Sequence, residues 1–420
     1  MRPSEEQPRR AFLKRTLAGA VLFHGLPVPA ALRAVRADEE KGAGISTPPL
    51  EGEDRSASAP TAPVAIERAK DFDVEKLATI MESLLDKAGG IAKLVQGKTV
   101  TVKLNTTGHG KQRLRGLAAE RTYQTHPNMV EVLCGLLARA GAKRIHLVES
   151  LYEVKSPEAV YAAQGWNIER IHAASGRITS FEDTRFLGEF KDYVKMPVPW
   201  GGYVFPAYHL NRRYAETDVL ISLAKLKNHV TAGVTGAVKN LFGITPTALY
   251  GNDAPNERTT ENRGSVLHDG TKAVPGGVTA ERYDTWKNLG RGVCSYYRVP
   301  RVTADVYGLR PPDLSIVEGI ESCQGGEGPW CPRVRPIAPG LILAGRNGVT
   351  VDAIATAVMG YDPLAPVRAK PWYGDNHLEL LARAGVGTHD PARIEVRGVP
   401  LNEALHEYEP GLEGWIKKHV

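Results

Sequence analysis

Short apolar runs alternate with helical patterns along most of the chain, which is the arrangement expected of an α/β protein. Residues 98–104 alternate polar and β-branched side chains and predict a strand. Apolar residues then recur at helical spacing after Pro127, a residue suited to the first turn of a helix, until Gly141 ends the pattern. Residues 143–149 predict a second strand. A strand–helix–strand unit of this kind favours a parallel sheet.

The same patterns predict the remaining elements. Helices are expected at residues 74–85 (capped by Asp73), 156–164, 349–359 and 376–384; strands are expected at 218–224, 313–318, 341–344 and 393–396, with weaker strand signals near Arg177 and Val194. The sequence therefore predicts an α/β fold with a mainly parallel sheet flanked by helices, an irregular insertion, and an arrangement in one or two lobes.

The N-terminal region is expected to direct export. Residues 1–37 contain paired arginines, Arg9 and Arg10, followed by Phe-Leu-Lys, a modest apolar run and small residues before Asp38. This pattern resembles a twin-arginine signal peptide, with Pro8 where such signals usually carry Ser or Thr. We expect transfer by the twin-arginine machinery, a periplasmic or extracytoplasmic location, and no stable membrane span after cleavage. A basic amphipathic surface helix is the alternative reading of this region.

Composition divides the rest of the chain. Residues 38–66 are rich in Pro, Ala, Ser and Glu without a period, and predict a disordered linker. The α/β domain is expected in two parts, residues 67–249 and 306–420. Between them, residues 250–305 are expected to form an insertion or a lid, because a silent loop of that length is uncommon in a compact domain.

The net charge of the chain comes mainly from the predicted signal. The whole sequence carries 53 Lys and Arg against 47 Asp and Glu; residues 1–37 hold 7 of the basic and 2 of the acidic residues, which leaves 46 against 45, or about +1. This balance gives no support for a nucleic-acid partner or an anionic membrane surface.

The four cysteines do not form a metal-binding pattern. None lies in a Cys-x-x-Cys motif, so a zinc ribbon or an iron–sulfur cluster is not expected, and no metal ligands are predicted. Cys134 lies on the apolar face of a predicted helix and is expected in the core. Cys323 and Cys331 flank a Gly-rich loop, where either a disulfide or two free thiols are compatible with the sequence.

The strongest candidate for chemistry is the stretch 225–246, which follows the predicted strand 218–224. It contains lysines, an Asn-His pair, two glycines and a second Lys-Asn pair; the candidate ligand-binding residues here are Lys227, Asn228, Lys239 and Asn240, with His229 as a candidate catalytic residue. Polar groups at the carboxyl end of a buried strand are typical of ligand sites in open α/β sheets. Residues 231–238 have helical length, and their glycines would allow close approach of a backbone or a ligand.

Other segments supply further candidates for the same edge of the sheet. Lys103 and Asn105 end the first predicted strand and are candidate ligand-binding residues, because a lysine that alternates into a buried sheet requires an anion, which we expect a ligand to supply. Glu327, in a Gly-rich loop, is expected to face the site, although turn formation alone would explain the glycines. Asp352 is expected to cap a helix terminus.

These motifs resemble the DUF362 family, which is named for its unknown function. The resemblance runs from about residue 98 to 398, and its most specific part is Lys-x-Asn-His followed by Thr-Gly-Ala-Val-Lys-Asn-Leu-Phe-Gly at 235–243. Many members of the family carry a cysteine-rich ferredoxin-like module, which this chain lacks.

The spacing from His229 to Lys239 also resembles the lactate racemase family. Its motif His-x-x-Ala-Gly-x-x-Gly-x-x-Lys matches residues 229–239, and Thr125-His126-Pro127 is similar to its Thr-His-Arg-Pro. The resemblance implies His126 and His229 as an acid/base pair and Lys239 as an anchor. The residues do not identify a cofactor; only this distant resemblance implies a nickel-pincer-type nucleotide, and the family's Asp-x-x-x-Arg segment is absent.

Two functions follow from these candidates. The first is an exported enzyme that uses His126 and His229 for proton transfer on a small anionic molecule, a carboxylate or a phosphate. Neighbouring lysines would keep His229 neutral. The alternative is a non-enzymatic exported protein that binds or carries a cofactor or a phosphorylated ligand. For either histidine a purely structural role is the competing interpretation, and for His126 that role would be a helix N-cap.

Overall fold

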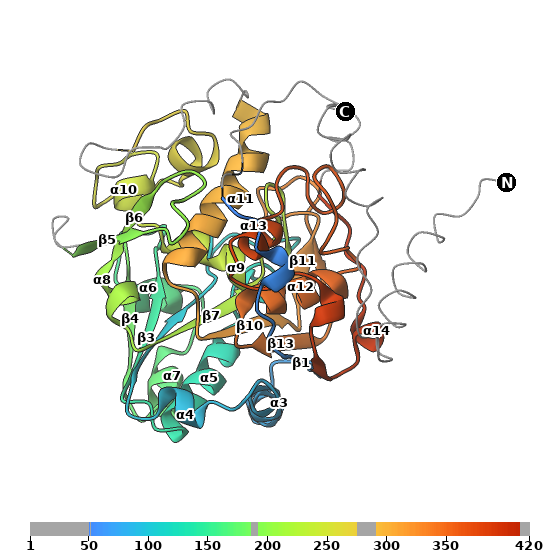
Figure 1. Ribbon diagram of the computed structural model, residues 1–420. Helices are drawn as coiled ribbons and strands as arrows, with labels where there is room; N and C mark the ends of the chain where they lie inside the picture. Colours follow the sequence, from blue (N-terminus) through green and yellow to red (C-terminus); the bar gives the residue numbers. More distant parts are fainter. Residues whose placement is uncertain (1–49, 51, 186–191, 275–290, 412–420) are drawn as a thin grey trace.

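An eight-stranded sheet lies at the centre of the structure, a computed structural model that describes residues 50, 52–185, 192–274 and 291–411 (Figure 1). The strand order is β14-β1-β13-β10-β7-β2-β3-β4. The strands are β1 (Val64–Arg68), β2 (Thr99–Lys103), β3 (Arg144–Glu149), β4 (Thr179–Asp183), β7 (Val219–Lys225), β10 (Leu314–Gly319), β13 (Leu341–Gly345) and β14 (Val396–Gly398).

Most neighbouring strands run parallel, which confirms the predicted fold class. The pairs β10–β7, β7–β2, β2–β3, β3–β4 and β1–β14 are parallel. Only β13 runs against both of its neighbours in this sheet, β1 and β10. Strands from both predicted parts of the domain share the sheet, so the chain that the structure describes forms one lobe around it.

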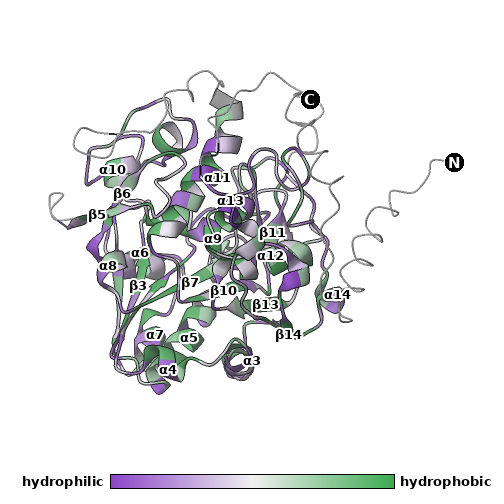
Figure 2. Cartoon of the chain, in the orientation of Figure 1, coloured by the Kyte–Doolittle hydropathy of each residue, from purple (hydrophilic) through white to green (hydrophobic). Residues whose placement is uncertain are grey.

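Helices cover both faces of the sheet because its central strands are apolar on both sides. In β7 the side chains of Val219, Ile221 and Leu223 join one core, while Leu220 and Ala224 join the other. In Figure 2 this strand lies toward the green, hydrophobic end of the scale.

One core is shared with α3 (Val74–Lys87), α4 (Ala92–Val95), α5 (Pro127–Arg139), α6 (Pro157–Ala163) and α7 (Ile168–Ala174). The other is shared with α9 (Gly236–Asn240), α11 (Arg291–Leu309), α12 (Gly348–Val358) and α13 (His377–Arg383).

Local sequence signals set several helix boundaries as predicted. Asp73 caps α3, and Ser156 caps α6, in each case through a side-chain oxygen that accepts a backbone N–H three residues later. Pro127 occupies the first turn of α5. Asn376 caps α13, and Asn347 caps α12.

Smaller elements surround the sheet. Three hairpins pair β5 (Tyr193–Pro197) with β6 (Ala207–Asn211), β8 (Asn228–His229) with β9 (Gly233–Val234), and β11 (Ser322–Gln324) with β12 (Arg335–Ile337). The short helices are α8 (Arg212–Glu216), α10 (Thr247–Tyr250) and α14 (Leu401–Ala404), together with the 3-10 turn η3 (Leu241–Ile244).

The ordered fold begins before the predicted boundary at residue 66. The backbone N–H of Arg55 donates to the carbonyl of Arg383 at 2.9 Å, and the Arg393 guanidinium donates to the carbonyls of Ser56 and Ala59. Residues 52–66 are therefore part of the domain. The predicted signal peptide and the start of the predicted linker, residues 1–49 and residue 51, lie outside the described residues.

The predicted insertion at 250–305 ends earlier than expected. Helix α11 begins at Arg291 and runs through Pro300 to Leu309, with Val299, Val302 and Val306 buried in the core. The helix thus belongs to the α/β domain. Residues 252–274 are irregular apart from one π-helical turn, η4 (Gly264–His268), and residues 275–290 of the predicted insertion lie outside the part described.

The stretch expected to be helical at 231–238 is mostly a hairpin. Strands β8 and β9 pair across residues 230–232, and helix α9 begins only at Gly236. The glycines permit close approach by protein groups. A Cβ atom on Gly233 would lie 2.5 Å from the Trp372 ring, and one on Gly236 would lie 2.4 Å from the Asp352 carboxylate.

Candidate functional site

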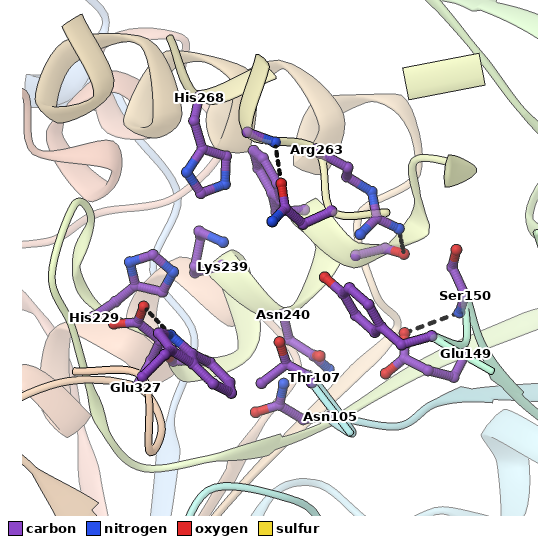
Figure 3. Close-up of a pocket in the computed structure, with 18 of the residues that line it drawn as sticks. Asn105, Thr107, Glu149, Ser150, His229, Lys239, Asn240, Arg263, His268 and Glu327 are labelled. Atoms are coloured by element: carbon purple, nitrogen blue, oxygen red, sulfur yellow. Dashed lines mark hydrogen bonds between the residues drawn. The ribbon is translucent and has the colours of Figure 1, made fainter. Parts of the chain in front are cut away.

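A cavity of about 590 Å³ lies at the carboxyl ends of β2, β3 and β7 (Figure 3). Parallel strands end at the same edge of a sheet, so the residues that follow them converge there. Among the predicted site residues, those that line the cavity are Lys103, Asn105, Lys227, His229, Lys239, Asn240 and Glu327. His126 and Asn228 do not belong to its lining.

Lys103 has a protein anion as its partner. Its Nζ lies 2.7 Å from Oε1 of Glu149 at the end of β3, and it donates to the Leu104 carbonyl at 2.6 Å. Both side chains of this ion pair are almost fully buried. Burial lowers the pKa of Lys103, and the Glu149 carboxylate opposes that shift. The sequence led us to expect a bound ligand as the anion for Lys103, whereas in the structure the partner is the Glu149 carboxylate.

Lys227 is held by backbone oxygens. Its Nζ donates to the carbonyl of Tyr123 at 2.6 Å and to that of Glu327 at 3.2 Å. Burial lowers the pKa of Lys227 to about 8. The group lines the cavity, but two of its three hydrogens are directed to the protein.

Lys239 differs from both of these lysines. Its side chain is 8% exposed and lines the cavity, yet its Nζ has no hydrogen-bond or ion-pair partner within residues 50–411 as far as the structure describes them. Its Nζ lies over the Phe242 ring, 3.9 Å from the ring centroid. Burial lowers the pKa of Lys239 to about 7, against the opposing effect of the Glu327 carboxylate and with that of the Arg263 guanidinium.

Helix α9 positions Lys239 through a buried carboxylate on α12. Both oxygens of Asp352 accept hydrogen bonds at the start of α9, from Ala237 N–H at 2.7 Å and from Val238 N–H at 2.8 Å. Asp352 is thus a capping residue, as predicted, but it caps the neighbouring helix while Asn347 caps its own. Burial raises the pKa of Asp352 to about 7.

His229 presents an N–H group to the cavity. Its Nδ1 accepts from the backbone N–H groups of Thr231 and Ala232, each at 3.3 Å, which places the ring proton of the neutral form on Nε2. Burial and the charge on Lys239 hold the pKa of His229 well below its usual value. The residue is therefore a neutral hydrogen-bond donor.

His126 does not join His229. Its Nδ1 accepts from Asn128 N–H at 3.2 Å as the N-cap of α5, and its ring stacks on Phe72 with centroids 3.6 Å apart. Burial, followed by the charges of Lys225 and Arg121, lowers its pKa to about 3. The structure thus gives His126 the N-cap role, and the predicted acid/base pair is not assembled.

Three further candidates have structural partners. Asn228 donates to the Tyr361 hydroxyl at 3.0 Å and accepts from Gly325 N–H at 3.1 Å, away from the cavity lining. Asn105 accepts from Lys225 N–H at 3.3 Å. Asn240 donates to the Lys103 carbonyl at 3.3 Å and to the Ser222 hydroxyl at 3.1 Å, which ties α9 to β2 and β7.

Glu327 faces the cavity with both oxygens fixed. Oε2 accepts from Val230 N–H and Oε1 from the Trp330 indole, each at 2.9 Å. The carboxylate therefore lies on the same wall as His229, as Figure 3 shows.

The sequence did not identify Arg263 and His268, which complete the site. Arg263 donates through Nε to the Thr245 carbonyl at 2.8 Å and through Nη2 to that of Gly243 at 3.2 Å. His268 lies near Lys239 in Figure 3, and burial followed by the Lys239 charge lowers its pKa to about 3. Both come from the irregular segment after Tyr250, where no periodicity or motif distinguishes one polar residue from another.

Two hydroxyl groups at the cavity also have no protein partner. Thr235 Oγ1 and Ser150 Oγ are buried without a hydrogen bond to any residue that the structure describes. Both residues line the cavity. Together with Lys239 they offer donors to a polar molecule.

The structure also shows which of the two predicted states the cysteine side chains adopt. Cys323 and Cys331 are both free and buried, so of the two alternatives the structure contains the thiols, and Cys134 is in the core as predicted.

Across the described ranges, no helix is long and apolar enough to cross a bilayer. Within the same ranges, no group of three or more His, Cys, Asp or Glu residues is placed to hold a metal ion.

The lactate racemase motif implies a nickel-pincer nucleotide, but only some of the residues that this group would require are in place here. Lys239 is available as an anchor, whereas the histidine that should complete the acid/base pair caps α5. The residues present therefore do not fit that group.

The fold and site define an α/β protein with a polar cavity at the carboxyl edge of its sheet. The chain belongs to the family described as "Domain of unknown function (DUF362)", whose model matches residues 100–357. A relative, the thylakoid-associated protein sll1697 of Synechocystis sp., is 23% identical over 302 residues, which are 71% of this chain and 75% of the relative.

Two solved structures resemble the chain at a lower level. A protein from Thermotoga maritima matches with a TM-score of 0.32 and 11% identity over 64% of this chain. The lactate racemase apoprotein from Thermoanaerobacterium thermosaccharolyticum matches with a TM-score of 0.37 and 12% identity over 76% of this chain. The chain spans only 55% and 61% of these two proteins, and similarity this low carries no argument about the site.

Proposed function

We propose that this protein is an enzyme that binds a small anionic molecule, a carboxylate or a phosphate, and performs acid–base chemistry on it. The observation that carries the proposal is Lys239, a buried amine that lines the cavity without an anionic partner in the described chain. A charge buried in this way costs free energy unless it is paired. An anionic ligand would supply the missing partner.

The residues around Lys239 support specific roles. Arg263 lines the same cavity, and its guanidinium has hydrogen-bond partners but no carboxylate partner among the described residues. It would hold the anionic group of the ligand. His229 would donate from Nε2 to an oxygen on which negative charge develops. Lys239, with a pKa of about 7, would accept and return the proton, because catalytic groups work best near the ambient pH.

Ligand binding can be tested with simple probes. In calorimetric titrations of the mature protein with pyruvate and with inorganic phosphate, we expect Lys239→Met to weaken binding by about tenfold or more. Lys93→Met, at an exposed position on α4, is the matched control and should leave the affinity unchanged. Absence of binding by the unaltered protein, or equal binding by Lys239→Met, would remove the proposal.

Proton transfer is tested separately from binding. In deuterium oxide, the protein should exchange the methyl protons of pyruvate for deuterium, and NMR would follow the loss of the methyl signal. His229→Ala should abolish this exchange while circular dichroism shows that the fold persists.

A second candidate function is a non-enzymatic carrier for a cofactor or a phosphorylated ligand. The observation that favours it is the neutral, donor-only state of His229, which suits holding a ligand as well as catalysis. A carrier would bind phosphate or pyruvate through the lysines without exchanging any proton. The exchange experiment therefore separates the two functions.

The location of the protein is also part of the proposal. Arg9 and Arg10 with the following apolar run support export through the twin-arginine route to the periplasm or another extracytoplasmic space. Replacing both arginines by lysine should retain the precursor in the cytoplasm, as measured by cell fractionation. Unchanged export of that variant would contradict the route.

A further inference from the structure

We propose that Lys239 is a nucleophile that forms an imine with the carbonyl group of a small 2-oxo acid or a comparable anionic aldehyde. The inference rests on the proposed function and names its substrate class. It gives Lys239 a covalent step in place of the proton transfer assigned to it above, and that proton transfer passes to the Glu327 carboxylate, which lines the same cavity.

The first support is the contrast between the three lysines of the cavity. Lys103 has the Glu149 carboxylate as its partner, and Lys227 donates to two carbonyl oxygens. Lys239 Nζ lies over the face of Phe242 and, within the described chain, donates no hydrogen bond and forms no ion pair. A nucleophilic amine needs a free lone pair in a desolvated site near another cation, and of these lysines only Lys239 has those surroundings.

The second support is the rigid backbone under Lys239. Helix α9 is fixed at its start by two hydrogen bonds to Asp352 and at its end by Asn240, whose amide donates to β2 and β7 residues. A site built on fixed elements holds a nucleophile at a constant position relative to its substrate.

The third support is the set of groups that would handle the rest of the substrate. Arg263 would bind the carboxylate or phosphate, and the Nε2–H of His229 would donate to the carbonyl oxygen. The unpartnered hydroxyl of Thr235 lies at the same cavity. Groups of all three kinds are needed for a carbonyl compound that carries an anion.

The step balances without an external oxidant or reductant. The neutral amine of Lys239 attacks the carbonyl carbon, and the C=O electron pair moves to oxygen as a proton passes from nitrogen to that oxygen. Loss of water, with a second proton taken up by the leaving oxygen, gives the protonated imine. The iminium then acidifies the adjacent C–H bond; the Glu327 carboxylate at the cavity takes that proton, and the C–H electron pair forms the enamine. Reprotonation and hydrolysis return Lys239 and the exchanged substrate.

Burial, followed by the cationic neighbours, lowers the pKa of Lys239 to about 7 and so keeps part of this amine neutral near that pH. The titratable and charged groups that influence it electrostatically are Glu327, Arg263, Lys227, Lys103, His229, His268 and His377. Only Glu327 among them favours the protonated amine, and burial opposes it. The rate of imine formation should therefore rise as the pH passes through about 7.

Borohydride trapping tests the inference. The mature protein is incubated with pyruvate and sodium borohydride, digested, and analysed by mass spectrometry. We expect Lys239 to gain the mass of pyruvic acid less one oxygen atom, while Lys227, the matched lysine of the same cavity, remains unmodified.

A charge-conserving variant completes the test. Lys239→Arg keeps a cation but lacks the nucleophile, so it should bind pyruvate within about threefold of the unaltered protein and lose both the adduct and the deuterium exchange. Binding and exchange by the unaltered protein without an adduct on Lys239 would overturn this inference and leave the proposed function standing. Absence of pyruvate and phosphate binding would instead overturn the proposed function itself. The mapping of the adduct in the unaltered protein does not depend on whether any variant folds.

Discussion

Nζ of Lys103 lies 2.7 Å from Oε1 of Glu149, and this ion pair joins the carboxyl ends of β2 and β3 at the cavity lining. Glu149 also accepts hydrogen bonds from Thr106 N–H and Ser150 N–H, each at 3.0 Å. The carboxylate therefore connects three segments at the sheet edge. Its negative charge is paired with Lys103. Lys239 is therefore the cavity lysine that has no anionic partner within the described chain.

Removal of Lys103 alone should be costly for this reason. Lys103→Met leaves the Glu149 charge buried without its partner, and we expect the free energy of unfolding to fall by about 3–5 kcal/mol. In Lys103→Met/Glu149→Gln the Glu149 charge is absent, so the free energy of unfolding should fall by less in the double variant than in the single variant. Urea denaturation measures both. A double variant less stable than Lys103→Met would contradict the ion pair as the source of the effect.

His126 should be replaceable by another N-cap residue. Asn at this position can accept the same backbone hydrogen bond, so His126→Asn should keep pyruvate binding and deuterium exchange unchanged. His126→Leu removes the cap and should lower the free energy of unfolding by about 0.5–2 kcal/mol. Loss of exchange in a stably folded His126→Asn variant would restore His126 as a catalytic residue.

Gly236 should tolerate no side chain. Its φ is +52°, and a Cβ atom would lie 2.4 Å from the Asp352 carboxylate that fixes α9. We expect Gly236→Ala to destabilise the protein by about 2–4 kcal/mol and to weaken phosphate binding through displacement of Lys239.

Gly90→Ala is the matched control for this effect. Gly90 has a similar φ of +69°, but no atom lies within 4 Å of the added Cβ. Gly90→Ala should therefore lower the free energy of unfolding by about 1 kcal/mol and leave phosphate binding intact. Equal losses in the two variants would show that backbone strain alone is responsible.

The affinity for a carboxylate should depend on pH with a defined sign. Because the pKa of Lys239 is lowered to about 7, the free protein loses the positive charge as the pH rises through that value. A bound anion near Lys239 favours the protonated amine, so linkage requires the affinity for acetate, a carboxylate with no reactive carbonyl, to fall by about tenfold per pH unit between the free and the bound pKa. Calorimetry from pH 6 to 9 measures this slope, and a flat profile would mean that a carboxylate held by Arg263 does not affect the charge of Lys239.

The sequence predicted most of the fold because the fold depends on local patterns. Period-two and helical repeats located β2, α5 and β3, and cap residues such as Asp73 marked helix starts. The antiparallel direction of β13 has no such signal, since a buried apolar strand reads the same in either direction.

The candidate site was only partly predictable. Residues after β2 and β7 could be placed because parallel strands end together, which brought Lys103, Lys227 and His229 to one cavity. The charge partners of these residues could not be predicted, because the pairing of Lys103 with Glu149 depends on side-chain geometry across two strands. His126 was misjudged for a related reason: a histidine before Pro127 reads equally as a cap or as a catalytic group.

Titration of the Lys239 Cε carbon by NMR tests most directly whether this amine is uncompensated in the cavity. In protein labelled with ¹³Cε-lysine, one resonance should titrate near pH 7, should be absent from Lys239→Arg, and should move to higher pH when phosphate is added. A Lys239 resonance that titrates near the ordinary lysine pKa of about 10.4, unaffected by phosphate, would contradict the account.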